Sequence, residues 1–359
     1  MIRVLAAATV VASAACSSPS LAPVVSTTDS LPPRAFRMGF SAAPPRLDPA
    51  TMVQTIDTWD DRADAALLLL DVPWHGLLAD SSAADLVNRD ALPLVRIYRQ
   101  RGFPIVAMVE PADGLARDRE APALIAAGRS ITETAVQARY QAYVLALDSI
   151  VHPEFLGLAA ETNLIRASAP RAMYSALGTM TRNTAAALHA RGTTARLFVS
   201  VQVETAWGRL AGTGKFVGIN TDLHDFPFID VLGLSSYPFL GGFTDPASVP
   251  DDYYERLQAR AGLPAIVVEG GWSSTSVAMV SSTPELEARW IDRQMELASK
   301  QPLVAVFQIT FTDLDLASYG SSASAPLATF AHLGLVDTKF RPKPALAAWD
   351  STFLRPLHP

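Results

Sequence analysis

Eight short apolar runs, most of them followed by an Ala/Leu-rich stretch, set the strongest constraint on the fold of this chain. Leu67–Leu70 is apolar at consecutive positions, as in parallel strands that are buried on both faces. Strands that alternate with helices over about 300 residues predict an α/β fold, a single-domain (β/α)8 TIM barrel. A doubly wound open sheet is the alternative, although it would normally have fewer strands. The expected strands are Phe36–Ser41, Ala65–Val72, Ile105–Glu110, Phe155–Glu161, Arg196–Val203, Ile229–Ser236, Ala265–Glu269 and Val304–Thr310.

Several segments between these runs have helix start and stop signals. Thr283 before Pro284 provides an N-cap and a proline in the first turn. A cation followed by glycine, as in Arg191-Gly192, is typical of a helix C-terminus. The expected helices are Asp85–Gln100, Ile131–Ile150, Pro170–Arg191, Asp251–Ala261 and Pro284–Lys300.

The N-terminal segment has a different character from the barrel sequence. A basic start, the apolar run Val4–Ala12 and small residues before Cys16 are typical of a secretory signal. With Cys16 as the first mature residue, the segment resembles a bacterial lipoprotein signal, which implies lipid attachment at Cys16. An ordinary signal peptide cleaved elsewhere is the alternative. We expect residues 1–15 to be the signal peptide, residues 16–34 a Ser/Pro-rich tether and residues 35–359 the barrel.

This organisation predicts an extracytoplasmic lipoprotein, in the periplasm or at the cell surface. The apolar run is far shorter than the roughly 20 residues of a membrane-spanning helix, so the expected membrane contact is the lipid anchor alone. The chain has 29 Lys and Arg against 35 Asp and Glu, a formal net charge of −6. A nucleic-acid partner is therefore not expected, because it requires a basic face. We expect a monomer.

Several motifs of other enzyme classes are absent from the sequence. A single cysteine excludes a zinc site built from four cysteines and a CxxC redox pair. The six histidines form no HExxH motif, and no G-x-S-x-G elbow is present. Gly212–Lys215 resembles a phosphate-binding loop, but Phe216 follows the lysine where that motif requires Ser or Thr. We therefore expect neither a metal nor a cofactor.

Acidic and aromatic residues recur where the expected strands end. In a TIM barrel these ends form the face that carries function. Carboxylates can exchange protons with a glycosidic bond, and indole faces stack on sugars, so this mixture favours a neutral polyhydroxylated ligand. Any one of these acids could instead cap a helix or pair with a surface cation. The residues at this rim are Asp71, Trp74, His75, Glu110, Glu161, Asn163, Glu204, Trp207, Tyr237, Glu269, Trp272, Gln308 and Asp313.

Four segments carry a family resemblance. Phe155–Asn163 resembles the fourth strand of clan A glycoside hydrolases, and Ala265–Trp272 resembles the seventh. Asp230–Phe239 is similar to the sixth strand of the endo-β-1,4-galactanases, and the tail from Gly334 to Ala345 is similar to the closing segment of such barrels. The resemblance implies that Glu161 is the acid/base and Glu269 the nucleophile of a glycosidase.

The reaction that this resemblance implies is retaining hydrolysis of a β-linked glycan. Its two carboxyl groups lie about 5–5.5 Å apart, against roughly 6.5–9.5 Å in inverting enzymes. Glu161 would have to hold a proton at the start, which partial burial beside an ionised Glu269 favours. Tyr237 is expected to hydrogen-bond Glu269. The other expected substrate-binding residues, each of which could equally be a packing residue, are Trp272, Trp207, Trp74, Asn163 and Glu110.

The chain also departs from the clan A pattern. Clan members carry Asn before the acid/base, where this chain has Ala160. An arginine usual on the second strand is missing from Leu67–Asp71, and Ile309–Phe311 holds no Trp on the eighth. A second hypothesis therefore stays open: a catalytically weakened barrel that binds glycan at the cell surface.

Overall fold

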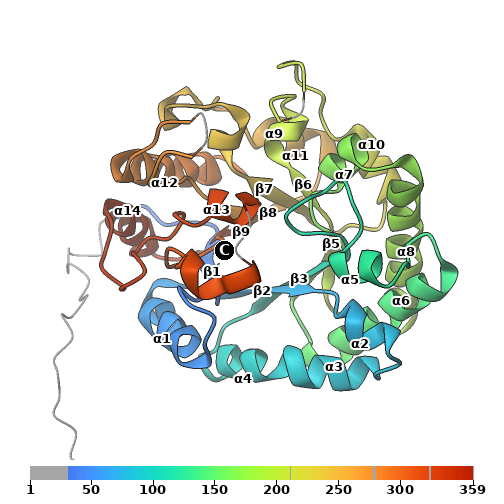
Figure 1. Cartoon of the computed structure of the whole chain (residues 1–359). Coiled ribbons are helices and arrows are strands. Elements are labelled where there is room, and N and C mark those ends of the chain that lie inside the picture. Colours follow the sequence, from blue (N-terminus) through green and yellow to red (C-terminus); the bar gives the residue numbers. More distant parts are fainter. Residues whose placement is uncertain (1–30, 211, 278–279, 323–324, 359) are drawn as a thin grey trace, which may run out of the picture.

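The computed structural model describes residues 31–358, except 211, 278–279 and 323–324. Parallel strands surround one axis and helices cover their outer side (Figure 1). This arrangement confirms the predicted (β/α)8 barrel. Cys16, the expected signal peptide and most of the expected tether lie outside the described residues. No helix in the described part of the chain has the length and apolar character needed to cross a membrane.

The strands form one sheet in the order β5-β4-β3-β2-β1-β9-β8-β7-β6, with every neighbouring pair parallel. β5 and β6 are two halves of the fifth barrel strand, interrupted at Val199. The Leu158 amide donates to the Phe198 carbonyl at 2.9 Å, and the Gly233 amide donates to the Val199 carbonyl at 3.0 Å. The interrupted strand therefore joins β4 to β7 and closes the barrel. The bounds are β1 Arg37–Ser41, β2 Ala65–Asp71, β3 Ile105–Glu110, β4 Phe155–Gly157, β5 Arg196–Phe198, β6 Ser200–Gln202, β7 Leu232–Ser236, β8 Ala265–Gly270 and β9 Leu303–Gln308.

Two phenylalanines fill the barrel interior, and glycines paired with them on the neighbouring strands make room for their rings. A Cβ atom at Gly157 would lie 2.5 Å from the Phe198 ring, and one at Gly39 would lie 2.7 Å from the Phe307 ring. Both rings are fully buried. The interior is thus a packed core, and the open space for a ligand lies beyond the strand ends.

The helices pack their apolar sides against the outer face of the strands. The expected helix Asp85–Gln100 is two helices, because Pro93 has no amide hydrogen and begins a new helix after Ala91. The Thr283 hydroxyl caps its helix as expected, accepting from the Leu286 amide at 3.3 Å. The α-helices are α1 Pro49–Trp59, α2 Trp74–Leu78, α3 Ala83–Asp90, α4 Leu92–Gln100, α5 Pro122–Ala126, α6 Thr134–Val151, α7 Thr162–Ser168, α8 Arg171–Ala190, α9 Val203–Ala206, α10 Asn220–Asp225, α11 Glu255–Ala261, α12 Pro284–Ser299, α13 Ala325–Thr329 and α14 Pro344–Phe353.

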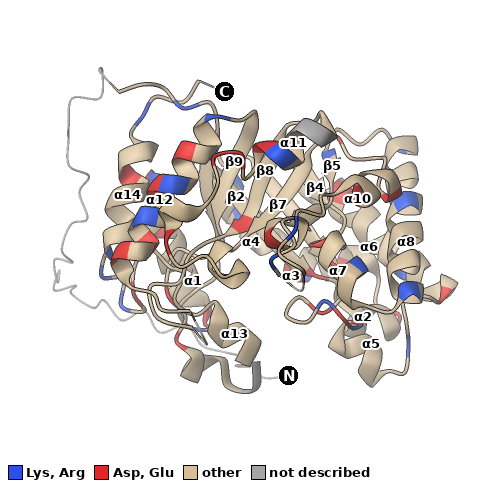
Figure 2. Cartoon of the chain, turned by 90° about the horizontal axis from the view of Figure 1, so that it is seen from above, with Lys and Arg blue, Asp and Glu red and all other residues tan. Residues whose placement is uncertain are grey.

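Both ends of the described chain meet at the amino-terminal end of the barrel. Arg34 donates from Nη2 to Asp64 at 3.0 Å, and its amide donates to the Pro356 carbonyl at 2.9 Å. Arg34 is therefore part of the folded body, although we expected it to end the tether. The C-terminus lies at the end opposite α2, α5 and α13 (Figure 2), and charges of both signs are spread over the outer helices.

Candidate active site

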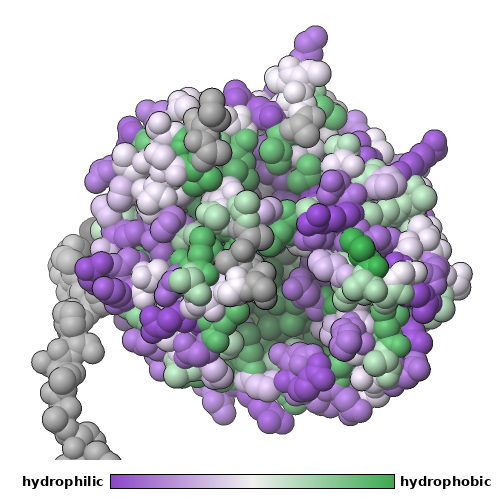
Figure 3. Space-filling view, viewed as in Figure 1, coloured by the Kyte–Doolittle hydropathy of each residue, from purple (hydrophilic) through white to green (hydrophobic). Residues whose placement is uncertain are grey.

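Three buried glutamates meet at the carboxyl ends of the strands. Glu110 ends β3, Glu161 follows β4 and Glu269 lies near the end of β8. Each is only 8–9% exposed. The face that carries these strand ends is hollowed near its centre, with hydrophobic residues in the floor of the hollow (Figure 3). The structure therefore brings the two expected catalytic acids to one mouth.

The backbone at Glu161 is held in an unusual conformation. Its φ of 49° and ψ of 45° are left-handed, a region that side chains other than glycine rarely adopt. The Ser200 hydroxyl accepts from its amide at 2.9 Å, and its carbonyl accepts from Leu164 at the start of α7. Such a residue costs about 1–3 kcal/mol and persists where its surroundings fix it, often at functional sites.

A bulge in β8 turns Glu269 toward the mouth. Ile266 and Val268 lie in the barrel interior, so strict alternation would direct residue 269 outward to the helices. Leu234 pairs with Val267, but the next residue, Ser235, pairs with Glu269, which leaves Val268 as an extra residue. The irregularity shifts the alternation by one position and allows the Glu269 carboxyl to lie beside Ser235.

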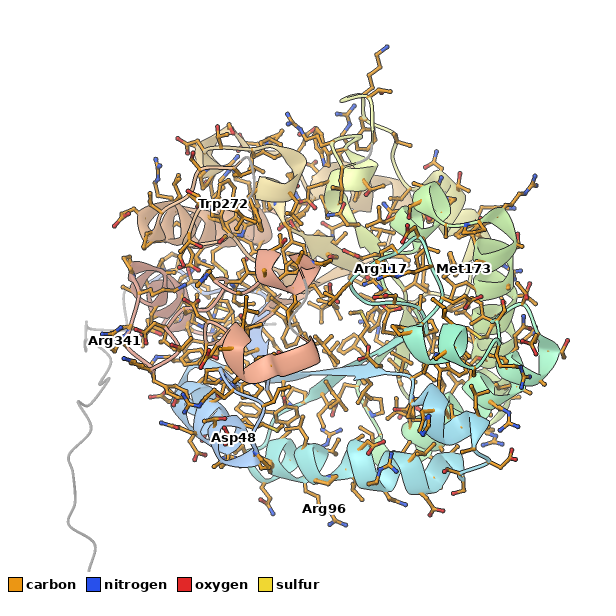
Figure 4. The ribbon with its side chains drawn as sticks, viewed as in Figure 1. Asp48, Arg96, Arg117, Met173, Trp272 and Arg341 are labelled. Carbon is orange, nitrogen blue, oxygen red and sulfur yellow. The ribbon has the colours of Figure 1, made fainter. Side chains whose placement is uncertain are left out.

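Arg117 is the main site residue that the sequence did not reveal. It lies between β3 and α5, is 8% exposed, and donates from Nε to Glu161 Oε2 at 2.8 Å. Its Nη1 donates to Glu110, whose other oxygen accepts from the Ala112 amide at 3.0 Å. Arg117 points into the space beside the barrel axis (Figure 4). A single arginine in an irregular loop follows no periodic pattern, so its position became visible only in the fold.

Ser235 is the second unexpected site residue, and it connects the two expected catalytic acids. Its Oγ lies 2.6 Å from Glu161 Oε1 and 3.3 Å from Glu269 Oε2. These two carboxylate oxygens are therefore at most about 6 Å apart, which suits the closer of the two known glycosidase spacings.

The pKa of Glu269, the acid that was expected to be ionised, is raised. Burial, followed by the charge of Glu161, raises the pKa of Glu269 to about 8, against a smaller opposing effect of Arg117. Glu161 accepts hydrogen bonds from the Arg117 guanidinium and the Ser235 hydroxyl. Burial therefore favours a proton on Glu269 in the ligand-free protein. The assignment of the two catalytic roles stays a prediction.

Tyr237 lies close to the acids, but Ser235 makes the hydrogen bond to Glu269 that was expected of it. The Tyr237 ring packs edge-on against Phe330, with centroids 5.1 Å apart. Burial and the charges of Glu269 and Glu161 raise the pKa of its hydroxyl well above the ordinary value. Tyr237 therefore lies within the electrostatic field of the mouth and remains a neutral hydrogen-bonding group there.

Trp74 and Trp272 are packing residues, which corrects the expectation that they stack on a sugar. Trp74 is 1% exposed and donates from Nε1 to the Pro111 carbonyl at 3.0 Å. Trp272 is 0% exposed, donates to Ser282 at 2.9 Å, and lies away from the barrel axis toward α12 (Figure 4). Neither indole ring is exposed to solvent. The loops at the strand ends need buried apolar residues to hold them in place, and these two tryptophans have that role.

Trp207 and Asn163 are also engaged by the protein itself. Tyr253 stacks against Trp207 with centroids 5.5 Å apart, and its carbonyl accepts from the indole at 3.0 Å. The side-chain amide of Asn163 donates from Nδ2 to the backbone carbonyl of Gln202 at 2.9 Å, and its Oδ1 accepts from the backbone amide of Gln202 at 2.7 Å. Asn163 is 1% exposed, so it connects α7 to β6 and does not face the mouth.

Glu204, another acid of the expected rim, is completely buried. Its carboxylate accepts from Tyr253 and from Gln202. Burial nevertheless raises its pKa to about 7. Among the described residues, no group of three or more His, Cys, Asp or Glu side chains could hold a metal ion.

Replacing Glu204 by glutamine will make stability less dependent on pH. The folded pKa of about 7 lies above the ordinary value of 4.5, so the folded state binds this proton more tightly. The free energy of unfolding therefore falls as pH rises through that window, by up to about 3 kcal/mol, and glutamine removes this contribution. Urea unfolding of both proteins at about pH 5 and about pH 8.5 measures it. Equal pH dependence in the two proteins would contradict the assignment.

Comparison with known protein families gave no match for the sequence, and none came from the curated proteins. Solved structures do match. An exo-β-1,4-mannosidase from an Opitutaceae bacterium aligns with a TM-score of 0.65 and 14% identity over 92% of this chain and 62% of its own. A GH5_18 protein from Bifidobacterium longum aligns with a TM-score of 0.64 and 16% identity over 90% of this chain and 81% of its own. The GH53 catalytic domain of Ignisphaera aggregans aligns with a TM-score of 0.62 and 12% identity over 92% of this chain and 99% of its own.

These neighbours are glycoside hydrolases of clan A. At such low identity they establish the shared barrel fold. The chain spans 50% of the length of two matching β-glucuronidases, from an uncultured Clostridium and from Dictyoglomus thermophilum. The closer resemblance to endo-β-1,4-galactanases stays a prediction.

Proposed function

We propose that this protein is a retaining glycoside hydrolase that acts on a β-linked glycan. The contacts of the Ser235 hydroxyl with both acids support the proposal most directly. They limit the separation of the Glu161 and Glu269 carboxylate oxygens to that of a retaining pair. Glu269 attacks the anomeric carbon while Glu161 gives its proton to the leaving oxygen, which yields a glycosyl ester and a free alcohol. Water, deprotonated by Glu161, then attacks the anomeric carbon and releases Glu269.

The charges around Arg117 support a neutral sugar as substrate. Its guanidinium bonds Glu110 and Glu161, and the charge of Glu269 also acts on it. No positive charge is left over at this position for an anionic sugar. A GH5_18 protein among the structural neighbours was solved in complex with Manβ1-4GlcNAc, a neutral β-linked disaccharide.

Glycan binding without turnover is the second candidate. Ala160 occupies the position where clan A members carry the Asn that bonds the sugar 2-hydroxyl, and it is fully buried in the barrel interior. This position offers the sugar no hydrogen bond, which would weaken catalysis more than binding.

Hydrolysis assays with the full-length chain separate the two candidates. Aryl β-glucosides, β-mannosides and β-galactosides, together with β-linked polysaccharides, are the substrates, and NMR identifies the anomer formed first. We expect turnover with a β-configured first product. An α-configured first product would contradict retention, and polysaccharide binding without any turnover would support the second candidate.

A further inference from the structure

Ser235 lies on the inward face of β7. Gly233 shares that face, since a Cβ atom there would lie 2.9 Å from the interior Phe198 ring. Ser236, the next residue, faces outward, and its hydroxyl accepts from Tyr254 at 3.1 Å. Alternation along the strand therefore places one buried hydroxyl between the acids and a second one away from them.

The Ser235 hydroxyl has one hydrogen and cannot donate to both acids at once. Its contact with Glu161 is the shorter, 2.6 Å against 3.3 Å with Glu269. If the hydrogen lies toward Glu161, the contact with Glu269 is satisfied by a proton on that carboxyl, donated to Ser235 Oγ. The three groups then form one chain in which every hydrogen points toward Glu161.

We propose that the Ser235 hydroxyl relays a proton from Glu269 to Glu161 and thereby converts the resting site into its reactive form. This inference rests on the proposed function, because the proposed hydrolysis needs a proton on Glu161 and a charge on Glu269. In the step, the O–H bond of Glu269 breaks as Ser235 Oγ gains that proton. The original O–H bond of Ser235 breaks as Glu161 Oε1 gains its proton. The hydroxyl is regenerated, and the carboxylate charge has moved to Glu269.

The charged groups around the pair permit this exchange. Arg117 loses an ionised partner in Glu161 but keeps Glu110, whose bond to Nη1 does not depend on the relay. The charge that appears on Glu269 lies close enough to Arg117 and to the Tyr237 hydroxyl to act on both. The net charge of the cluster is the same before and after transfer, so the step requires no ion to enter or leave.

Two variants of equal shape isolate the hydroxyl. Ser235→Thr keeps the hydroxyl and Ser235→Val replaces it with a methyl group, so any cost of the added bulk is common to both. We expect Ser235→Val to lose roughly 10²-fold in kcat on natural glycosides, the lower end of proton-transfer effects, and Ser235→Thr to keep most of it. Ser236→Ala, which removes the outward hydroxyl of the same strand, is the control and should retain wild-type kcat.

An infrared measurement tests the resting chain without any turnover. At neutral pH the wild type should show a protonated-carboxyl C=O band that is absent from Glu269→Gln. Loss of its acceptor in Ser235→Val should move this band to higher frequency, whereas Ser235→Thr should leave it in place.

The two measurements separate failure of the relay from failure of the proposed function. A wild type without turnover contradicts the hydrolase, and the infrared bands still decide the hydrogen-bonded chain. Equal kcat for Ser235→Thr and Ser235→Val in an active enzyme overturns the relay. An unmoved Glu269 band in Ser235→Val also overturns it.

Discussion

Replacing Glu269 by glutamine will abolish turnover on every glycoside while leaving glycan binding intact. An amide cannot form the glycosyl ester. Glu110, the third buried glutamate at the mouth, is already bonded to Arg117 and to the Ala112 amide. Loss of a nucleophile typically costs about 10⁴–10⁶-fold in kcat. The measurement compares kcat on aryl and natural glycosides, with isothermal titration for binding.

The melting temperature of the Glu269→Gln variant is the control that shows whether the protein still folds. Glutamine cannot ionise, and the Glu269 carboxyl has a pKa of about 8, so the substitution should preserve or raise the melting temperature above that pH. A Glu269→Gln protein that melts normally and still turns over an activated aryl glycoside would contradict the nucleophile assignment.

Replacing Glu161 by glutamine will have an effect that depends on the leaving group. Proton donation is worth about 10²–10⁴-fold in rate, so natural glycosides should lose that much. A dinitrophenyl glycoside departs without a proton, so its first step should survive and the glycosyl enzyme should accumulate. Azide needs no general base and should restore turnover as a β-glycosyl azide, which mass spectrometry and NMR identify.

The same assays detect an exchange of roles. Arg117 donates a hydrogen bond to Glu161 in the resting structure, whereas clan A enzymes carry their arginine near the nucleophile. If azide rescued Glu269→Gln while Glu161→Gln stayed inactive on every substrate, Glu161 would be the nucleophile. The Ser235 relay would then be unnecessary, because the resting protons would already be in the reactive arrangement.

The sequence predicted the barrel because its signal is repeated along the whole chain. Apolar runs such as Leu67–Leu70 recur between helical segments, and this run does form part of β2, although Leu69 near the end of the strand is exposed. Glu161 and Glu269 could also be brought together, since the carboxyl ends of parallel barrel strands share one face. The conformations that aim them, a left-handed residue and a bulge at Val268, have no signature in the sequence.

The rest of the candidate site depends on contacts between distant segments. Arg117 reaches Glu161 from an irregular loop, and Ser235 differs from Ser236 only in the face of β7 to which it points. The tryptophans illustrate the opposite error. An indole at a strand end has the same sequence context whether it faces a ligand or, like Trp272, is sealed beneath a helix.

The two ends of the described chain lie together around Arg34, and this determines which side of the barrel faces outward when the protein is attached through its N-terminal segment. Arg34 and Pro356 meet at the barrel end opposite the one where Glu161 and Glu269 lie. A surface, bead or fusion partner attached upstream of Pro32 would hold the barrel by its closed base, with the open mouth directed outward. Large insoluble glycans could then approach without passing the point of attachment.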